Sequence, residues 1–474
     1  MSHPPSPPTS SPGSPSANGE RPQLILCADG GGSKVCVVIR SSDGIEVRGT
    51  AGPCNVQSVG HIPAADRILE ATYKALSLLP TSYLPDGFTI PHLQQPLPPH
   101  AIPSGVRSRM ASPHASGYNT PRVRPPPLSQ SLFALCWIAL AGFTTDADTA
   151  AFLPFISTAL NTPGDRFTLT NDVNLLAAPA VHLSGLSHCV AVVCGTGTIA
   201  RTIKVGNREE NLPPSPPVEV RSVDGNDDPM AGTVTTNGTS SKQKKQKGLP
   251  LQDIGVSRGW GYMLDDEGSA FWVGRLAIRY VLSNWDRAHS TGVYSSPVPE
   301  TLPLHTDLLE YFEVDDPTEL IGIVSLMTSF VDGLTIGEAS AKRNAYQAGA
   351  GRVVFKWAFP ADSGVQITTD LKKASHEAAL KIAKSAIEPL VDLTLSALGD
   401  RSVVEPARTA LTLGGGLMNS NGYRQLLLQG LKARGVSFRD VLLVDDAAGE
   451  GGKALAAVAF GQVSAAHTFG LCVI

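Results

Sequence analysis

Three glycines separate two apolar runs near the start of the sequence, in the stretch from Leu26 to Ile39, LCADGGGSKVCVVI. A glycine turn lets backbone N–H groups approach a phosphate closely because no Cβ blocks them, and a serine hydroxyl adds a donor. The stretch lacks the G-x-x-x-x-G-K-[ST] spacing of a P-loop, and Val35, Val37 and Ile39 recur with the period of two that is typical of a strand. The pattern predicts a β-hairpin whose turn can bind phosphate.

A second hairpin of the same kind is predicted at 188–206, where HCVAVVC and IARTIKVG flank the turn GTGT. Two such hairpins in one chain indicate a duplicated domain. Helical and strand-like segments alternate around them, which predicts α/β layers in both halves. The expected elements are a helix at 64–79, a strand at 131–142, a strand at 166–171 leading into a helix at 173–180, a long helix at 376–398, a strand at 409–416, and a strand, turn and closing helix at 441–460.

The composition favours a small-molecule partner. The sequence has 38 basic and 42 acidic residues, a balance that gives no reason to expect nucleic acid or an anionic membrane. The first twenty residues lack the apolar core of a signal peptide, and the longest apolar run, 134–143, is too short to span a membrane. The seven scattered cysteines fit reduced core thiols. We expect a soluble, cytoplasmic protein.

Three segments are poor in apolar residues and are predicted to be disordered: a tail at 1–20, an insertion at about 85–130 and an insertion at about 205–250. The rest predicts two domains. The N-terminal domain is expected to span 21–185 and to be completed by a C-terminal helix at about 453–465, and the C-terminal domain to span 186–452.

Six motifs resemble, in order, those of the BadF/BadG/BcrA/BcrD-type ATPase and N-acetylglucosamine kinase family, within the sugar kinase, Hsp70 and actin superfamily. They are ADGGGSK, the corner GPCN, TNDVNLLAAPA, VVCGTGT, SRGWGYMLDDEGSAFWVG and LTLGGGL. The resemblance covers nearly all of the chain outside the predicted insertions. It implies an α/β fold with duplicated actin-like (ribonuclease H-like) ATPase domains flanking an interdomain cleft, and it implies ATP and Mg²⁺ as cofactors.

The same resemblance implies roles for individual residues. Asp29 is expected near Mg²⁺, with water between them, and the two glycine turns on the phosphates. The implied nucleotide-binding residues are Gly30, Gly31, Gly32, Ser33, Gly195, Thr198, Gly414, Gly415 and Gly416. The implied sugar-binding residues are Asn55, Asp172, Thr196, Gly197, Gly259, Trp260 and Asp266. Phe271 and Trp272 are read as core aromatics, and Lys34 as either a phosphate contact or an exposed lysine.

Asp172 has two interpretations. Asn and Asp are favoured at helix N-caps, so Asp172 could cap the predicted helix, although Asn171 could already do so. The resemblance instead implies that Asp172 is the general base that accepts the proton of a sugar hydroxyl during phosphoryl transfer. One position departs from the family pattern, because Asp265 replaces a glycine. If that glycine has φ > 0 the aspartate is strained there, and its charge could raise the pKa of Asp266 or change hydroxyl selectivity.

The resemblance therefore implies an ATP-dependent sugar kinase that converts N-acetyl-D-glucosamine to its 6-phosphate, with an amino sugar and ATP as partners. A homodimer is compatible with the sequence. The alternatives are another hexosamine or hexose kinase, a BadF-type ATPase that activates another enzyme, and a non-catalytic sugar or nucleotide sensor. The iron–sulfur branch of the ATPases needs placed cysteines, for which the sequence offers no C-x-x-C pair.

Overall fold

The first half of the chain forms a five-stranded mixed sheet in a computed structural model that describes residues 21–32, 34–91, 124–206, 249–290, 301–325 and 336–461. The strand order is β3-β2-β1-β4-β5, with β1, β2 and β3 antiparallel and β4 and β5 parallel to β1. The predicted first hairpin is thus confirmed. The strands are β1 (Leu24–Gly30), β2 (Val35–Ser41), β3 (Glu46–Ala51), β4 (Phe133–Leu140) and β5 (Phe167–Thr170).

The second half forms a sheet with the same connectivity, in the order β10-β9-β6-β7-β8. Here β6, β7 and β8 are antiparallel, and β9 and β10 are parallel to β6. Order and strand directions match those of the first sheet, so the predicted duplication and the second hairpin are confirmed. The strands are β6 (His188–Cys194), β7 (Thr198–Val205), β8 (Leu251–Arg258), β9 (Thr409–Gly414) and β10 (Asp440–Leu443).

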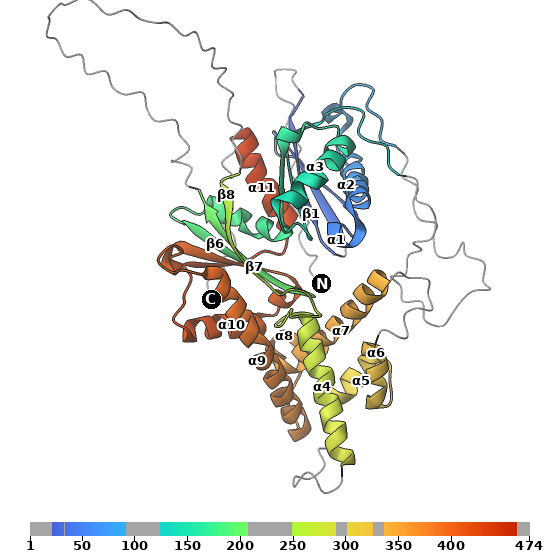
Figure 1. Cartoon of the computed structure of the whole chain (residues 1–474), viewed down its shortest axis with the longest axis vertical. Helices are drawn as coiled ribbons and strands as arrows, with labels where there is room; N and C mark the ends of the chain where they lie inside the picture. The colour runs from blue at the N-terminus through green and yellow to red at the C-terminus, as the bar shows by residue number, and fades with distance from the viewer. Residues whose placement is uncertain are drawn as a thin grey trace, which may run out of the picture.

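Helices cover both faces of the first sheet (Figure 1). On one face α2 packs against β2 and β3, and the carbonyl of Ala71 in α2 lies where a Cβ on Gly49 would be. On the other face α11, the last helix, packs against β1, β2 and β4. The helices of this half, with the one from the chain's end, are α1 (Val56–Val59), α2 (His61–Leu76), η1 (Thr81–Tyr83), α3 (Asp146–Ala159), η3 (Gly164–Arg166), η4 (Asp172–His182) and α11 (Ala447–Phe460).

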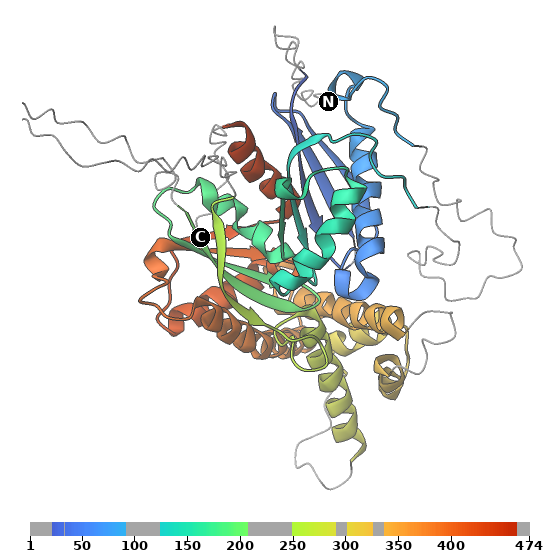
Figure 2. The same ribbon diagram turned by 45° about the horizontal axis from the view of Figure 1, so that its top comes forward.

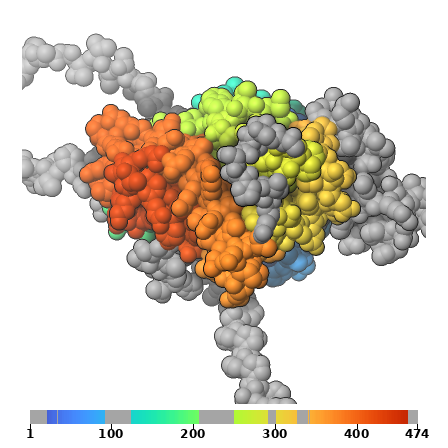
Figure 3. Space-filling view, turned by 90° about the horizontal axis from the view of Figure 1, so that it is seen from below, coloured from blue at the N-terminus to red at the C-terminus, as the bar shows by residue number. Residues whose placement is uncertain are grey.

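The second half carries a larger helical layer, in which α9 packs on β6, β7 and β8 and α4 packs on α7 and α9. Figure 2 shows α4 pointing away from both sheets, and Figure 3 shows the end of the molecule that these helices form. The helices are α4 (Ala270–His289), α5 (Pro303–Phe312), η5 (Pro317–Glu319), α6 (Leu320–Val324), α7 (Ile336–Ala358), α8 (Pro360–Ser363), α9 (Asp370–Leu398), η7 (Pro406–Arg408), η8 (Gly416–Asn419) and α10 (Asn421–Ala433).

The segment η4 lies between the two sheets. It packs against β1 and β4 of the first sheet and against β6, β7, β8 and β9 of the second. The residues that precede η4 end β5, so this segment leads the chain from one half to the other. The sequence predicted an α-helix here, whereas the structure has a 3₁₀ helix that contains Pro179, which cannot donate the hydrogen bond an α-helix would use.

The predicted start of the last helix is corrected. The last helix begins at Ala447, earlier than the predicted 453, because its glycines permit close packing: a Cβ on Gly451 would lie 2.5 Å from Leu175 and 2.7 Å from the Cys27 sulfur. Glycine has a low helix propensity, so the local sequence of this stretch predicts a turn.

The margins of the predicted insertions are ordered against the core. Leu128 is buried, the Tyr73 hydroxyl donates to the Pro126 carbonyl at 2.8 Å, and Arg124 pairs with Asp66 at 2.8 Å. Leu128 therefore belongs to the core despite its proline-rich surroundings. The tail at 1–20 and the central parts of both insertions, 92–123 and 207–248, lie outside the described residues.

Within the described ranges all six cysteines are free, and five are buried. This agrees with the prediction of core thiols, and Cys472 lies outside these ranges. No helix in the same ranges is both long and apolar enough to cross a membrane.

Candidate functional site

The turn of the first hairpin is joined to the GPCN corner by backbone hydrogen bonds. Gly31 N–H donates to the Lys34 carbonyl at 2.9 Å, and Cys54 N–H donates to the Gly31 carbonyl at 3.0 Å. Gly30, in turn, accepts from the backbone N–H of Ala141 at the end of β4. The predicted residues Gly30 to Gly32 thus lie beside the corner that carries Asn55. Gly32 and Lys34 are exposed, and Ser33 lies outside the described residues.

Asn55 is both a predicted sugar ligand and a helix cap. Its Oδ1 accepts a hydrogen bond from the Gln57 backbone N–H at 3.0 Å at the start of α1. The cap occupies the side-chain oxygen, whereas Asn55 Nδ2 donates no hydrogen bond to the described residues. Asn55 can therefore offer an N–H donor to a ligand.

Asp29 is a partly buried carboxylate near the end of β1, with no hydrogen bond or ion pair to the described residues. Burial and the negative charge of Asp172 raise the pKa of Asp29 to about 7, against the opposing effect of Lys34. An acid in this environment is stabilised by a cation. This chemistry fits the predicted Mg²⁺, which accepts oxygen ligands and retains water.

No group of three or more His, Cys, Asp or Glu side chains in the described parts of the chain is close enough to form a metal site. Were Mg²⁺ bound here, Asp29 would be the carboxylate that faces it, with water between them as the family resemblance implies. Bound there, the ion would neutralise phosphate charge.

Asp172 begins η4 but does not cap it with the usual geometry. Asn171 is the N-cap: its Oδ1 accepts from the Val173 N–H at 3.1 Å, and its Nδ2 donates to the Phe143 carbonyl at 2.9 Å. Asp172 Oδ1 also lies 3.1 Å from that N–H, its one hydrogen bond to the described residues. Burial raises the pKa of Asp172 to about 6, while backbone N–H groups and the charge of Arg201 act in the opposite direction.

The turn of the second hairpin is held by the loop that precedes α4. Gly195 N–H donates to the Gly197 carbonyl at 3.0 Å, and the Gly195 carbonyl accepts from the Ala270 N–H at 2.8 Å. Thr198 N–H donates to Asp266 Oδ1 at 3.1 Å, and the Thr198 hydroxyl donates to the Glu267 carbonyl at 3.3 Å. The predicted residues 195–198 and Asp266 are thereby brought together.

Gly259 lets this loop approach the turn. A Cβ on Gly259 would lie 2.3 Å from Asp266 Oδ1 and 2.5 Å from the Thr198 hydroxyl, so any larger residue would separate the two loops. Trp260 follows with φ of 53° and is 64% exposed, and the Arg258 guanidinium lies 5.4 Å from its ring centre. Phe271 is buried, as expected for a core aromatic.

Asp265 is not the strained residue of this loop. The non-glycine residues with a left-handed φ in this loop are Trp260 and Asp266, the latter at 55°, and Asp265 is not among the described residues of this kind. The expected electrostatic effect is present: burial raises the pKa of Asp266 to about 6, and the charge of Asp265 adds to the rise.

The glycines after β9 lie against the second hairpin. Gly415 has φ of 92°, and a Cβ there would lie 2.5 Å from the Cys194 carbonyl oxygen. A Cβ on Gly416, by contrast, would meet no atom within 4 Å. The backbone conformation and the contact with Cys194 therefore require glycine at 415. At Gly416, by contrast, no atom occupies the space that a Cβ would need.

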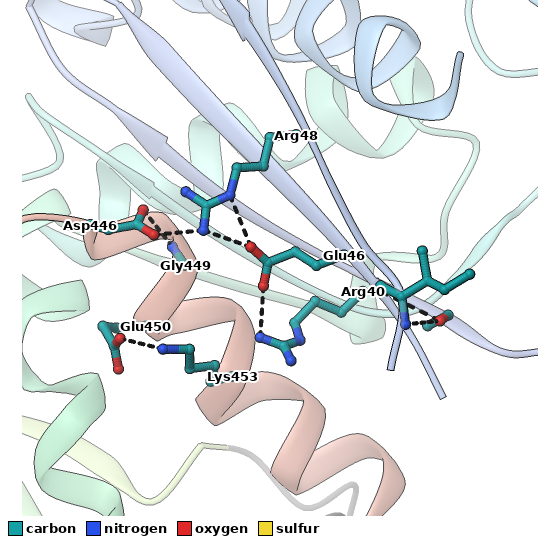
Figure 4. Close-up of polar contacts among 9 residues, drawn as sticks. Arg40, Glu46, Arg48, Asp446, Gly449, Glu450 and Lys453 are labelled. Carbon is teal, nitrogen blue, oxygen red and sulfur yellow. Dashed lines mark hydrogen bonds and ion pairs between the residues drawn. The ribbon is translucent and has the colours of Figure 1, made fainter. Parts of the chain in front are cut away.

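A charged network on the first sheet was not predicted (Figure 4). Arg48 in β3 contacts Glu46 and also Asp446, both at 2.6 Å, and Asp446 Oδ1 accepts from the Gly449 N–H at the start of α11. The charge of Asp446 also raises the pKa of Asp29. The sequence feature that could have indicated Asp446 is the pair of aspartates after the strand-like run VLLV, because aspartate is favoured at the start of a helix.

Arg201, Asp253 and Asn174 were also missed. Arg201 in β7 pairs with Asp253 at 2.7 Å, and Asp253 accepts from Asn174 of η4 at 3.0 Å. The signal for Arg201 was a basic residue at an inward position of an otherwise apolar alternation, TIARTIKV.

Two shallow surface hollows lie elsewhere. One is lined by residues of α5 and α7, including Asp307 and Lys356, and the other by residues of α9, including Lys381 and Lys384. Neither contains a predicted site residue, and we assign no ligand to them.

No known protein family matches the sequence, and no curated protein matches it in sequence. Among solved structures, a protein from Porphyromonas gingivalis provisionally named an N-acetylglucosamine kinase is 12% identical, with 92% of this chain and 98% of that one covered and a TM-score of 0.49. A protein from Chromobacterium violaceum with the same provisional name is 16% identical, with 91% and 99% covered and a TM-score of 0.47. The Schistosoma mansoni hexokinase complexed with glucose is 11% identical, with 94% and 86% covered and a TM-score of 0.41.

These similarities assign no activity to this chain. The fold assignment depends on the two sheets, whose strand orders and directions repeat, and on the last helix, which returns to the first sheet. The chain therefore has a duplicated α/β fold, in which two mixed five-stranded sheets share one strand order.

Proposed function

We propose that this protein is an ATP-dependent sugar kinase, and that its substrate is N-acetyl-D-glucosamine, phosphorylated at the 6-hydroxyl. The observation that supports the proposal most directly is the hydrogen bonding of the Asp172 carboxylate. Asn171 already caps η4, and the Asp172 carboxylate has one hydrogen bond, to the following backbone N–H. It is thus free to accept a proton on the segment that lies between the two glycine hairpins.

In the proposed reaction a sugar hydroxyl attacks the γ-phosphorus of ATP, the bond to the β,γ-bridging oxygen breaks, and ADP leaves. The hydroxyl proton passes to Asp172. Phosphoryl transfer depends mainly on positioning and charge stabilisation, which backbone N–H groups of the two glycine turns can supply. A base with a pKa of about 6 is largely ionised at neutral pH, as this role requires.

The sugar would contact the first half through Asn55 and the second through Thr196, Gly197, Gly259, Trp260 and Asp266. The Asp266 carboxylate is held by the Thr198 N–H and keeps further acceptor capacity for sugar hydroxyls. Adenosine would lie beside Gly414 to Gly416, and Asp29 would face Mg²⁺. We infer a cytoplasmic enzyme from its metabolite substrate.

The choice of N-acetylglucosamine rests on the family resemblance of these motifs, and other hexosamines or hexoses are the main alternative substrates. An ATPase that activates another enzyme, or a sensor, would use the same fold without phosphorylating sugar. The direct experiment measures ADP production with a panel of N-acetylglucosamine, N-acetylmannosamine, glucosamine and glucose. We expect N-acetylglucosamine to give the highest kcat/KM.

Each alternative has its own result in this experiment. Preference for another sugar would change the substrate and keep the reaction. ATP hydrolysis that no sugar stimulates would favour the activating ATPase. Sugar binding by calorimetry without sugar-stimulated ADP release would favour the sensor.

A further inference from the structure

Arg201 is a buried cation in an apolar layer. The side chains of β7 that face η4 come from alternate residues, and Ile199, Ile203 and Val205 pack there with apolar residues of η4 and β6. Arg201 has the same parity and is 8% exposed. A charged residue therefore occupies an inward position of β7 at which the alternation of the strand predicts an aliphatic side chain.

Arg201 is connected to η4 through two side chains. Its Nη1 lies 2.7 Å from Asp253 Oδ2 in β8. The other oxygen of Asp253 accepts from Asn174 Nδ2 at 3.0 Å, and Asn174 is 5% exposed. Asn174 is two residues after Asp172 in the same 3₁₀ segment. The chain of contacts thus leads from the second sheet to the segment that carries the candidate base.

Stability does not explain this arrangement. Burying a guanidinium costs free energy that a partly exposed partner repays incompletely, and the Asp253 side chain is 39% exposed. In addition, Arg201 Nε and Asn174 Oδ1 are buried without a hydrogen-bond partner among the described residues. An isoleucine or methionine at 201 would fill the apolar layer without these costs.

The electrostatic surroundings of Asp172 supply a reason. The charged groups that act on it are the Asp29 carboxylate of β1, which repels its negative charge, and Arg201 of β7, which attracts it. Burial and Asp29 both favour the protonated acid, which cannot accept a proton. The backbone N–H groups of Val173 and Asp172 act in the opposite direction, and Arg201 is the charged side chain that acts with them.

We propose that Arg201 is a positioning residue for Asp172, because it holds η4 in place through Asp253 and Asn174. Its positive charge additionally favours the ionised form of the Asp172 carboxylate. This inference rests on the proposed function, since it assigns Arg201 a part in the work of the general base. Arg201 itself contacts no substrate in this role.

Three variants test the inference through the pH profile of kcat. Arg201→Met removes the charge at similar length, so the acidic limb moves to higher pH, and kcat falls roughly 10-fold at pH 6 but at most about threefold at pH 8.5. Arg201→Lys keeps the charge and stays near wild type. Asp253→Asn leaves the Arg201 charge unneutralised, so the limb moves the opposite way, to lower pH. KM for ATP and for sugar changes little in all three.

An equal loss of kcat at every pH in the Met and Lys variants, with lower melting temperatures, would reduce Arg201 to a structural residue. An unchanged limb in both Arg201→Met and Asp253→Asn would overturn the electrostatic role. Carbon-13 NMR titration of Asp172, assigned by comparison with Asp172→Asn, gives a reading that needs no activity: Asp172 must titrate at higher pH in Arg201→Met. Failure of the proposed function would instead appear in the wild-type protein, as absent sugar-dependent ADP production.

Discussion

Asp29 and Asp172 are two carboxylates, from β1 and from the start of η4, whose charges act on one another. Together with burial, the charge of Asp172 raises the pKa of Asp29 to about 7, and burial raises that of Asp172 to about 6. Neither has an ion-pair partner among the described residues. The folded protein thus keeps two acids close together at a cost to its stability, a pattern typical of functional sites.

Replacing Asp29 should stabilise the protein at alkaline pH. Its pKa in the folded state lies above that of the unfolded chain, so its favourable contribution is complete below about pH 4 and is lost as the pH rises through about 7. Asp29→Asn should therefore raise the free energy of unfolding by roughly 1–3 kcal/mol at pH 8 and have little effect at pH 4. Urea unfolding at both pH values measures this.

Asp43 is the matched control, because hydrogen bonds from Ser41 and Tyr83 contribute to lowering its pKa. The ionisation of Asp43 therefore contributes to the free energy of unfolding with the opposite sign. This contribution is present above the pKa that Asp43 has in the unfolded chain and is lost as the pH falls. Asp43→Asn should thus lower the urea midpoint at pH 8. A lower midpoint at pH 8 for Asp29→Asn as well would show that Asp29 has a stabilising partner.

Asp266 should determine sugar affinity. Asp266→Asn keeps an acceptor for the Thr198 N–H but loses the charge, so we expect KM for sugar to rise about 10- to 100-fold, the cost of a charge-assisted hydrogen bond. KM for ATP should change less than threefold. The control is Asp265→Gly, which removes the neighbouring charge. Equal effects of the two variants on sugar KM would contradict a direct contact specific to Asp266.

Gly415 and Gly416 are neighbours with opposite tolerance. Gly415 has a left-handed φ, and its Cβ would overlap the Cys194 carbonyl, so Gly415→Ala should destabilise the protein by at least about 2 kcal/mol. Gly416→Ala meets open space and should change stability by less than about 1 kcal/mol. Thermal unfolding of both variants checks the difference. Similar melting temperatures would mean that the β9 turn relaxes away from Cys194.

The Arg48–Asp446 pair should contribute little to stability despite its short distance, because the two side chains are 43% and 44% exposed. A double-mutant cycle with Arg48→Met and Asp446→Asn should give a coupling energy below about 1 kcal/mol, and Asn at 446 still caps the helix. A coupling above about 2 kcal/mol would assign the pair a larger role in joining α11 to β3.

The sequence predicts the parts of the fold that local patterns specify. Period-two alternation around the glycine turns predicts both hairpins, and the Asn171–Asp172 pair predicts a helix start. The predicted start of α11 was wrong because the glycines of this helix are locally typical of a turn. In the structure these glycines allow close packing on Cys27 and Leu175. Helix propensity is a property of a single residue type, whereas this packing depends on contacts with residues that are far away in the sequence.

The same limit applies to the candidate site. The residues on the two glycine turns are recognisable from their motifs, but the contact of Arg201 with Asp253 joins positions 52 residues apart in the sequence. The hydrogen bond between Asn174 and Asp253 spans 79 residues. No local spacing indicates these pairs, and they become visible only once β8 is placed beside β7.

The central claim is that Asp172 accepts the sugar proton, and sugar-dependent ADP production by Asp172→Asn tests it most directly. Asparagine keeps the size of the side chain but cannot act as the base, so kcat should fall roughly 10²- to 10⁴-fold while ATP binding and the melting temperature are retained. Turnover within about threefold of wild type, in a variant that binds ATP normally, would contradict the account.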